Sequence, residues 1–362
     1  MPLTNPPLKQ SFFALSLEDL TKVLMQKGLN PSAATILYNY HYKKKLKGHN
    51  YNKVSKATLT FLKDQIDFTI PNISLAQEAQ DSTVKFLFEL EDGKKVESVL
   101  IPFHGKYSLC ISTQVGCAMN CSFCFTGTEG LSRNLTTAEI VGQFLGAWHW
   151  VQENREEAFP ISNLVFMGQG EPLHNFDPVK KACEIFLSQS GCSIGSQKIT
   201  ISTAGYLPGL KRWPKEMPPV NLALSLHSTH SDVRSELIPM NKKYPLAEVL
   251  AQIESIPLQK KQFVTYEYLL IAGLNDSEDD AKALGELLSG KEAYINLIPF
   301  NAFPQSKFQP PSIEMIEAFK KILDGYQVPT LIRKAKGEDV SAACGQLASG
   351  LVLKDLAAKP LL

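Results

Sequence analysis

The sequence predicts an α/β protein built on a partial, TIM-like (β/α)6 barrel, with a small helical domain before the barrel and a β-hairpin extension between the two. Two observations predict this class. After residue 130, five or six short apolar runs alternate with amphipathic helical segments. These runs are nearly continuous in apolar residues, as in parallel strands that are buried on both faces. Because eight such units are not visible, we expect an open barrel rather than a closed one.

The first domain, residues 1–75, is predicted to be a helical accessory domain. Apolar residues recur there at i, i+3 and i+4 in two stretches, which are Leu20, Val23 and Leu24, and then Ala33, Ile36 and Leu37. Asn30-Pro31 marks a helix start between the stretches. Residues 76–104 follow as a β-hairpin, because apolar strands at 84–90 and 96–102 flank a turn at Asp92-Gly93.

The barrel core is predicted at residues 105–350, with a C-terminal tail at 351–362. Its expected strands are 107–113, 163–168, 198–203, 220–227, 263–271, 294–300 and 330–334. Its expected helices include 136–150, 177–187, 246–254, 279–288 and 314–323. The carboxyl ends of these strands are therefore the place to look for chemistry.

Composition excludes a membrane protein, because no stretch approaches 18 consecutive apolar residues in a chain that is 44% hydrophobic. The first residues, MPLTNPPLKQ, lack the pattern of a secretory signal, so we expect a cytoplasmic protein. We also expect a monomer.

Charge is distributed unevenly along the chain. Residues 1–75 carry ten lysines and four acidic residues, a net charge of +6, whereas the whole chain carries +1. This asymmetry predicts that the N-terminal domain binds RNA through Lys43, Lys44, Lys45 and Lys47, with Tyr40 or Tyr42 stacking on bases. The alternative is a solvated, lysine-rich helix face.

The cysteine run GCAMNCSFCFTG is the most informative motif of the chain. It places Cys117, Cys121 and Cys124 in a CxxxCxxC pattern with no fourth cysteine nearby. Structural zinc sites usually have four protein ligands, and this motif supplies only three. The alternatives to an iron–sulfur cluster are three buried thiols or a zinc site. A [4Fe–4S] cluster held by three thiolates leaves one iron free to bind a substrate, which explains the missing ligand.

The same spacing, with Phe123 before the last cysteine, resembles the radical S-adenosylmethionine (radical SAM) signature. This resemblance implies a barrel of the radical SAM type. It also implies one [4Fe–4S] cluster per chain, whose open iron binds S-adenosylmethionine, and an external electron donor.

Polar residues at the predicted strand ends fit such a cofactor site. The motif MGQGEP supplies Gly170 and Glu171, and Glu171 is suited to bind the ammonium of the methionine moiety. Other strand ends supply Ser202, Ser225, Leu226, His227 and Asn301. Each feature alone is also typical of ordinary turn or capping chemistry.

Two further cysteines lie in informative contexts. Cys110 precedes the cluster motif in SLCIST, and Cys344 lies in DVSAACGQL. A small buried hydrophobic residue is the alternative for each of them.

Seven ordered motifs resemble the RlmN/Cfr family of radical SAM RNA methyltransferases over roughly residues 83–350. They are RNLT, MGQGEP, ISTAG, ALSLHS, IPMNKKYP, NLIPFN and RKAKGEDVSAACGQL. The resemblance implies that Cys344 is the cysteine that becomes S-methylated, Cys110 its resolving cysteine and Glu97 the proton acceptor. It assigns S-adenosylmethionine contacts to Gly170, Glu171, Ser202, Ser225, Leu226, His227 and Asn301.

The family mechanism gives these thiols a purpose. It implies two molecules of S-adenosylmethionine per turnover, one as methyl donor to Cys344 and one as radical source. The radical from the second molecule abstracts a hydrogen from the methyl group on Cys344. The methylene radical formed in this way adds to adenine and gives a covalent protein–RNA adduct. Glu97 then removes the ring proton, and Cys110 releases the product by forming a disulfide with Cys344, which a thiol reductant must reset.

Within this family, the motifs GEP and IPFN resemble the branch that methylates adenine at C2 rather than the resistance-type branch that methylates C8. The resemblance implies 23S rRNA, and also tRNA, as substrates. Two positions depart from the family pattern: Gln169, where GMGEP is usual, and Phe125, where a small residue is usual. The competing hypotheses are a radical SAM enzyme with a non-RNA substrate and a non-enzymatic, zinc-binding RNA module.

Overall fold

The computed structural model describes residues 9–156, 160–259, 262–303 and 306–347. Its main feature is a ten-stranded sheet with the order β14-β13-β12-β11-β10-β9-β6-β5-β4-β3. Among the described residues the two end strands, β14 and β3, do not pair with each other, so the sheet stays open. The predicted tail at 351–362 lies outside the described residues.

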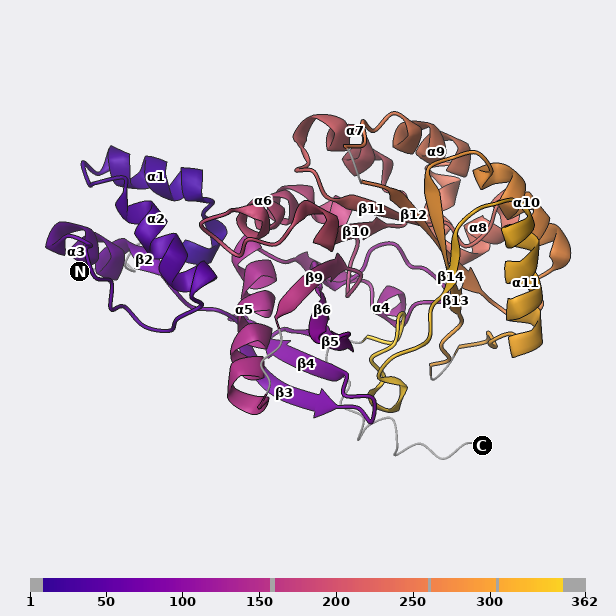
Figure 1. Cartoon of the computed structure of the whole chain (residues 1–362), viewed down its shortest axis with the longest axis horizontal. Coiled ribbons are helices and arrows are strands. Elements are labelled where there is room, and N and C mark those ends of the chain that lie inside the picture. Colours follow the sequence, from indigo (N-terminus) through magenta and orange to yellow (C-terminus); the bar gives the residue numbers. More distant parts are fainter. Residues whose placement is uncertain (1–8, 157–159, 260–261, 304–305, 348–362) are drawn as a thin grey trace, which may run out of the picture.

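Seven neighbouring strands of this sheet are parallel and form the partial barrel (Figure 1). They are β6 (Lys106–Cys110), β9 (Ile161–Phe166), β10 (Ile199–Thr203), β11 (Asn221–Ser225), β12 (Val264–Leu270), β13 (Ala293–Pro299) and β14 (Thr330–Ile332). The connecting helices are α5 (Thr137–Asn154), α6 (Phe176–Leu187), α7 (Leu207–Glu216), α8 (Ser231–Leu237), α9 (Leu246–Glu254), α10 (Glu278–Leu288) and α11 (Ile313–Gly325). The predicted open α/β barrel is confirmed.

Strands β3 (Asn72–Glu78), β4 (Val84–Glu89) and β5 (Lys95–Phe103) extend the barrel sheet with antiparallel pairing that ends on β6. The predicted hairpin is therefore β4 and β5. The sequence analysis did not predict β3, which crosses the proposed boundary between residues 75 and 76. Its segment NISLAQE is an edge strand with mostly exposed or half-exposed side chains, so it lacks a clear apolar alternation.

The two faces of the extension have different partners. Helix α5 covers one face so closely that a Cβ on Gly146 would lie 2.7 Å from Cε1 of Phe88. The Ser98 hydroxyl donates to the Gln143 side chain at 2.5 Å on this side. On the opposite face, strand register forms a transverse row of paired residues, which are Lys85, Val99, Cys110 and Val165.

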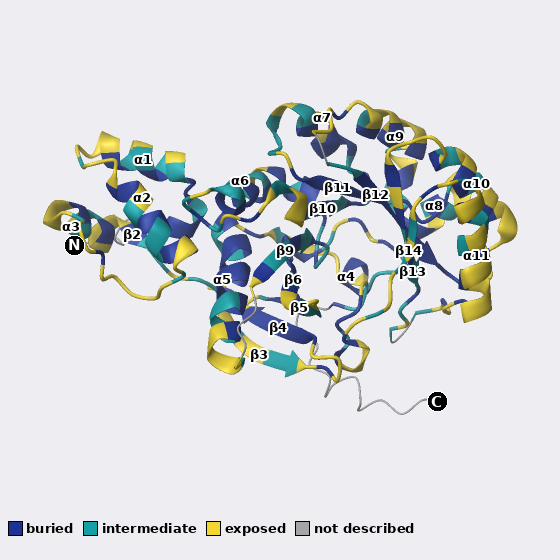
Figure 2. Ribbon diagram, in the orientation of Figure 1, coloured by how far each residue is buried: buried dark blue, intermediate teal, exposed yellow. Residues whose placement is uncertain are grey.

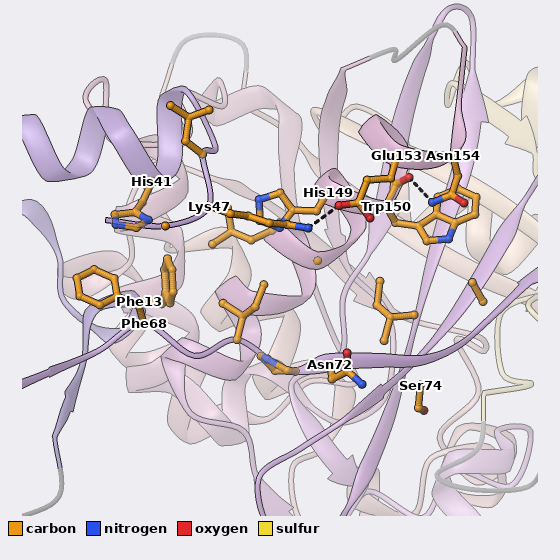
Figure 3. A pocket seen from close by; sticks show the side chains of 18 of the residues that line it. Phe13, His41, Lys47, Phe68, Asn72, Ser74, His149, Trp150, Glu153 and Asn154 are labelled. Carbon is orange, nitrogen blue, oxygen red and sulfur yellow. Dashed lines mark hydrogen bonds and ion pairs between the residues drawn. The ribbon is translucent and has the colours of Figure 1, made fainter. Parts of the chain in front are cut away.

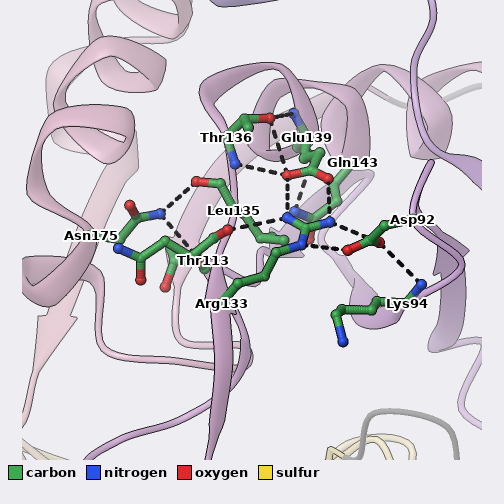
Figure 4. Close-up of polar contacts among 10 residues, drawn as sticks. Asp92, Lys94, Thr113, Arg133, Leu135, Thr136, Glu139, Gln143 and Asn175 are labelled. Carbon is green, nitrogen blue, oxygen red and sulfur yellow. Dashed lines mark hydrogen bonds and ion pairs between the residues drawn. The ribbon is translucent and has the colours of Figure 1, made fainter.

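A small second sheet carries the cysteine loop. Strands β7 (Gln114–Gly116) and β8 (Leu131–Asn134) pair antiparallel, and helix α4 (Phe125–Thr128) lies between them in the chain. Arg133 on β8 donates to Asp92 in the hairpin turn at 2.7 Å and to Glu139 on α5 at 2.8 Å (Figure 4). The hydrogen bond from Arg133 lowers the pKa of Asp92 to about 2. The RNLT motif thus ties three elements together.

The N-terminal region forms helices α1 (Leu17–Gln26), α2 (Ala33–Tyr38) and α3 (Lys56–Gln65), and a short sheet of β1 (Gln10–Ser11) with β2 (Ile66–Asp67). A π-helical turn over Asn39–Lys43 follows α2. Short 3-10 helices elsewhere in the described chain are Phe12–Ala14, Pro172–Asn175, Ser196–Lys198, Pro239–Lys242 and Glu338–Val340. An aromatic core fills the region, and its rings include Phe12, Tyr38, His41, Tyr42 and Phe68.

Burial follows this layering, with the parallel strands largely buried and the outer helix faces exposed (Figure 2). Among the described residues, no helix is long and apolar enough to cross a bilayer.

Candidate active site

The three cysteines of the CxxxCxxC motif lie together in the loop between β7 and α4. Gly116 allows this loop to start, because its φ is 74° and a Cβ there would lie 1.9 Å from the carbonyl oxygen of Gly130. The backbone N–H of Met119 points at the Cys117 sulfur, 3.5 Å away. The loop therefore brings its three thiols into one neighbourhood, as the spacing predicts.

The chemistry of these thiols fits a cluster that withdraws electron density. Burial raises the pKa of Cys117 to about 12 and also raises the pKa values of Cys121 and Cys124. Nearby thiol charges raise the pKa of Cys121 further. Such thiols ionise when a metal centre compensates their charge.

Within the described residues, no three His, Cys, Asp or Glu side chains converge on one metal ion. A [4Fe–4S] cluster does not need such convergence, because its thiolates bind separate irons.

Glu171 lies in the turn after β9, next to the cysteine loop. Its carboxylate accepts the N–H of Leu173 at 3.0 Å and that of Ala204 at 2.8 Å. Burial raises the pKa of Glu171 to about 7, although these hydrogen bonds act in the opposite direction. Gly170 approaches β7 so closely that a Cβ would lie 2.5 Å from Cβ of Gln114. The turn thus presents a buried carboxylate near the thiols.

Residues at the next strand ends surround the same space. Ser202 lies on β10 and Ser225 ends β11, and both are partly exposed. Leu226 is buried and donates its N–H to the carbonyl oxygen of Glu267 at 2.9 Å. These three predicted contacts therefore line the carboxyl edge of the parallel sheet.

His227 packs against the cysteine loop with its ring 4.7 Å from that of Phe123. Its Nδ1 accepts the N–H of Leu269 at 3.0 Å, and burial lowers the pKa of His227 to about 3. Its φ of 58° lies in the left-handed region. The Asn275 amide holds this conformation by donating to the His227 carbonyl at 2.6 Å.

Arg234 on α8 is a site residue that the sequence analysis missed. Its guanidinium donates to the carbonyl oxygens of Ser225 at 2.7 Å and Ala204 at 2.9 Å, and also to that of Leu226. The side chain is almost fully buried, and its charge acts to lower the pKa of Cys121. The only signal in the sequence is Asn241 of the IPMNKKYP motif, whose side-chain oxygen accepts from Arg234 at 3.2 Å.

Cys344 lies in a loop that contacts the cysteine loop directly. The N–H of Phe125 donates to the Gly345 carbonyl at 2.7 Å, and the Thr126 hydroxyl donates to the Leu347 carbonyl at 2.7 Å. Asn301 donates its amide to the Cys344 carbonyl at 3.2 Å. The predicted S-adenosylmethionine contact Asn301 therefore also positions the Cys344 backbone.

The other side of this loop covers the sheet extension. Cys110 packs with Val99, Val340 and Ala342 in one apolar cluster. The residue Cys344 is exposed, whereas Cys110 is buried, and both are free thiols. Burial is the main factor that raises the pKa of Cys110, and a charge on Cys344 raises it further.

Arg333 is a second missed residue. Its charge acts to lower the pKa values of both Cys110 and Cys344. The structure therefore brings the two thiols and a cation together, beside the cysteine loop.

Glu97 stands on the same sheet face as Cys110. It is two residues from Val99 along β5, and Val99 pairs directly with Cys110. Its side chain is 5% exposed and forms an ion pair with Lys85 at 3.1 Å. Its backbone N–H donates to the Gln169 side chain at 2.8 Å. Gln169, one of the two residues that depart from the family pattern, thus links the Glu171 turn to the strand that carries Glu97.

Phe125, the other residue that departs from the family pattern, fits into the apolar packing beside the cysteine loop. Its ring lies 5.6 Å from that of Phe303 in an edge-to-face contact, and it is largely buried.

A cavity of about 770 Å³ lies away from the cysteines, between the N-terminal region and the β3–α5 layer (Figure 3). His41, Phe68, Asn72 and Trp150 are among the side chains that line it. Lys47 also lines it and forms an ion pair with Glu153.

Tyr42 is fully buried against Phe12 and Tyr38 and cannot stack on RNA, so that part of the sequence prediction is wrong. Apolar packing in the aromatic core explains its position. Lys45 lies 3.7 Å from the ring centroid of Trp148, so it also packs within the protein.

Comparisons with known proteins agree with this site. A model of the radical SAM superfamily matches residues 111–284. The crystal structure of a radical SAM methyltransferase from Sphaerobacter thermophilus is 34% identical and superposes with a TM-score of 0.84, covering 93% of this chain and 99% of that one.

Curated relatives named dual-specificity RNA methyltransferase RlmN extend the likeness. One from Pelobacter propionicus is 47% identical over 74% of this chain and 75% of its own length. Another, from Rhodospirillum rubrum, is 39% identical over 96% of this chain and 82% of its own length. With identity of this level over most of its length, the chain belongs to the RlmN family of radical SAM RNA methyltransferases.

Proposed function

We propose that this enzyme methylates C2 of an adenine in 23S rRNA and in tRNA, by way of a methyl group carried on Cys344. The observation that carries the proposal is the meeting of Cys344 and Cys110, from opposite ends of the barrel, beside the CxxxCxxC loop. A radical SAM enzyme without a methyl-carrying thiol has no need of such a pair.

Cys117, Cys121 and Cys124 would hold the [4Fe–4S] cluster, which supplies the electron that cleaves S-adenosylmethionine to a carbon radical. Glu171 is suited to bind the ammonium of that molecule, because a buried carboxylate favours a cationic partner. Ser202, Ser225, Leu226, His227 and Asn301 are proposed to complete the site.

The roles of the remaining residues follow from what adenine C2 requires. This carbon is electrophilic and does not attack a sulfonium methyl, whereas the Cys344 thiolate does. Glu97 takes the ring proton from the adduct, and the unpaired electron of the adduct would return to the oxidised cluster that Cys117, Cys121 and Cys124 would hold. Cys110 then attacks the Cys344 sulfur: the disulfide forms, the carbon–sulfur bond breaks, and the carbon takes a proton to complete the methyl group.

An external electron donor and a thiol reductant belong to the proposal, since the cluster must be reduced and the Cys110–Cys344 disulfide reset. A reducing, cytoplasmic setting would supply the reductants for the cluster and the disulfide. The enzyme is proposed to act as a monomer. The regiochemistry is supported by the GEP and IPFN motifs.

The experiment that tests the proposal is anaerobic incubation of reconstituted enzyme with unmodified 23S rRNA fragments and tRNA, followed by nucleoside mass spectrometry. We expect 2-methyladenosine in both RNAs. Detection of 8-methyladenosine alone, or of no methylated adenosine by a cluster-loaded enzyme, would contradict it.

Binding of S-adenosylmethionine is expected to weaken in acid because of Glu171. Burial raises the pKa of this carboxyl to about 7, so it becomes neutral as the pH falls below that value and no longer attracts an ammonium. Affinity should fall about tenfold between pH 8 and pH 6. Equilibrium binding to the cluster-loaded enzyme measures this, with Glu171→Gln expected to bind weakly and without that pH dependence. If the affinity of the native enzyme for S-adenosylmethionine stayed constant between pH 8 and pH 6, Glu171 would not bind the ammonium as a carboxylate.

RNA binding by the N-terminal region is expected to depend mainly on Lys43 and Lys44. Both are exposed, whereas Lys45 and Lys47 make contacts within the protein. Replacing both exposed lysines by glutamine should weaken binding and reduce the slope of log affinity against log salt by about 1.4.

Filter binding at several salt concentrations measures this slope. Lys282→Gln with Lys321→Gln, two exposed lysines on the outer helices α10 and α11, provides the matched control. Equal slopes for the two double variants would mean that Lys43 and Lys44 do not contact phosphates.

A further inference from the structure

Lys85 is a buried charged residue in a strand whose other buried residues are apolar. Its neighbours on β4, Val84, Phe86 and Leu87, are buried, and Lys85 itself is only 5% exposed. Burying an ion pair carries a large desolvation cost, so the pair with Glu97 is a poor device for stability alone. A charge at this position therefore calls for a different explanation.

The contacts of Lys85 point to the reaction centre. Its ammonium lies 3.1 Å from a carboxylate oxygen of Glu97 and 3.5 Å from the carbonyl oxygen of Ser341. Ser341 is three residues before Cys344 and has a φ of 51°, in the left-handed region. One ammonium thus contacts both the carboxylate and the loop that carries the methylated cysteine.

Strand register fixes this arrangement. Lys85 pairs with Val99, which pairs with Cys110, and paired residues point to the same face of a sheet. Glu97 is on that face too, and the 338–347 loop covers it. The ammonium, the carboxylate and the resolving thiol therefore share one covered surface.

We propose that Lys85 is the positioning residue for Glu97, which keeps the buried carboxylate ionised and directed toward the Cys344 loop until it accepts the ring proton. This inference rests on the proposed role of Glu97. In the step concerned, the C–H bond of the ring breaks, the proton passes to a Glu97 oxygen and the electron pair stays with the ring.

The ionisable groups on the elements packed against this face limit the alternatives. Strand β4 brings Lys85, β6 brings Cys110, β12 brings Glu267, whose charge acts on Cys344, and the C-terminal segment brings Arg333 and Cys344. The turn after β9 contributes the neutral Gln169, which binds the Glu97 backbone. Lys85 contacts the carboxylate directly, so its removal should favour the protonated acid.

The test uses cluster-loaded enzyme already methylated on Cys344, mixed anaerobically with RNA and S-adenosylmethionine across a range of pH. For Lys85→Met we expect normal methylation of Cys344 but slow formation of methylated RNA, with the acidic limb of the rate profile moved up by at least about one pH unit. Lys85→Arg, which keeps a cation and guards against a failure to fold, should restore most of the rate and the original profile. Lys95→Met, on β5 and half-exposed, is the matched control.

An unchanged pH profile in Lys85→Met, or an arginine variant no better than the methionine variant, would overturn the inference. Glu97→Gln separates this failure from failure of the proposed function. If Glu97→Gln still forms methylated RNA at the native rate, Glu97 is not the base and the proposed function is wrong at that step. If Glu97→Gln is inactive while Lys85→Met keeps the native profile, the positioning role alone is wrong.

Discussion

Cys344→Ala is expected to abolish RNA methylation, by at least about a thousandfold, because no other group can carry the methyl. The variant should still load its cluster and cleave S-adenosylmethionine, since the three thiols of the CxxxCxxC loop are unchanged. Cys344 is exposed, so truncation should change the free energy of unfolding by no more than about 0.5 kcal/mol. The measurements are methylated nucleoside per enzyme, iron and sulfide content, and 5′-deoxyadenosine formed.

Cys192→Ala is the matched control, because Cys192 is a partly buried thiol that lies near Lys45 and Tyr42 of the N-terminal region. It should keep native activity. A folded, cluster-loaded Cys344→Ala enzyme that still methylates adenine would refute the role of Cys344.

Cys110→Ala is expected to fail at a later step. Addition to adenine does not need this thiol, but release does, so the protein should accumulate as a covalent RNA adduct that survives denaturation. Cys110 pairs with Val99 and contacts the loop that carries Cys344, so it lies on the sheet face that this loop covers. Denaturing gel electrophoresis with labelled RNA measures the adduct.

Cys183→Ala is the control for loss of a buried thiol, because Cys183 is fully buried on α6. It should cost roughly 1 kcal/mol of stability and lower all activities together. If Cys110→Ala released product at the native rate and formed no adduct, another group would have to resolve Cys344.

The parallel strands could be predicted from the sequence because they are buried on both faces, which makes each one a continuous apolar run. The cysteine spacing likewise indicated the kind of metal centre. Strand β3 could not be predicted, since its exposed side chains carry no periodic signal. The burial of Tyr42 could not be predicted either, because it depends on aromatic packing against Phe12, which is distant in the sequence.

Long-range contacts set the rest of the site. Arg234 and Arg333 look like ordinary surface cations in the sequence, yet the first holds three strand-end carbonyls and the second influences both thiols. Lys85 gave no signal at all, because its partner Glu97 meets it only through antiparallel register. The roles of Cys110, Cys344 and Glu97 came from family resemblance, and the structure adds that they lie on a shared surface.

The most direct test of the central claim follows the methyl group through the enzyme. Native enzyme is incubated anaerobically with S-adenosylmethionine that carries a CD3 group, and both the Cys344 peptide and the RNA nucleosides are analysed by mass spectrometry. Because one hydrogen leaves the methyl on Cys344 before its carbon reaches adenine, we expect a CD3 group on Cys344 and a methyl with two deuteriums on the RNA. An RNA methyl group that retains all three deuteriums, or a Cys344 peptide that never carries the label, would contradict the account.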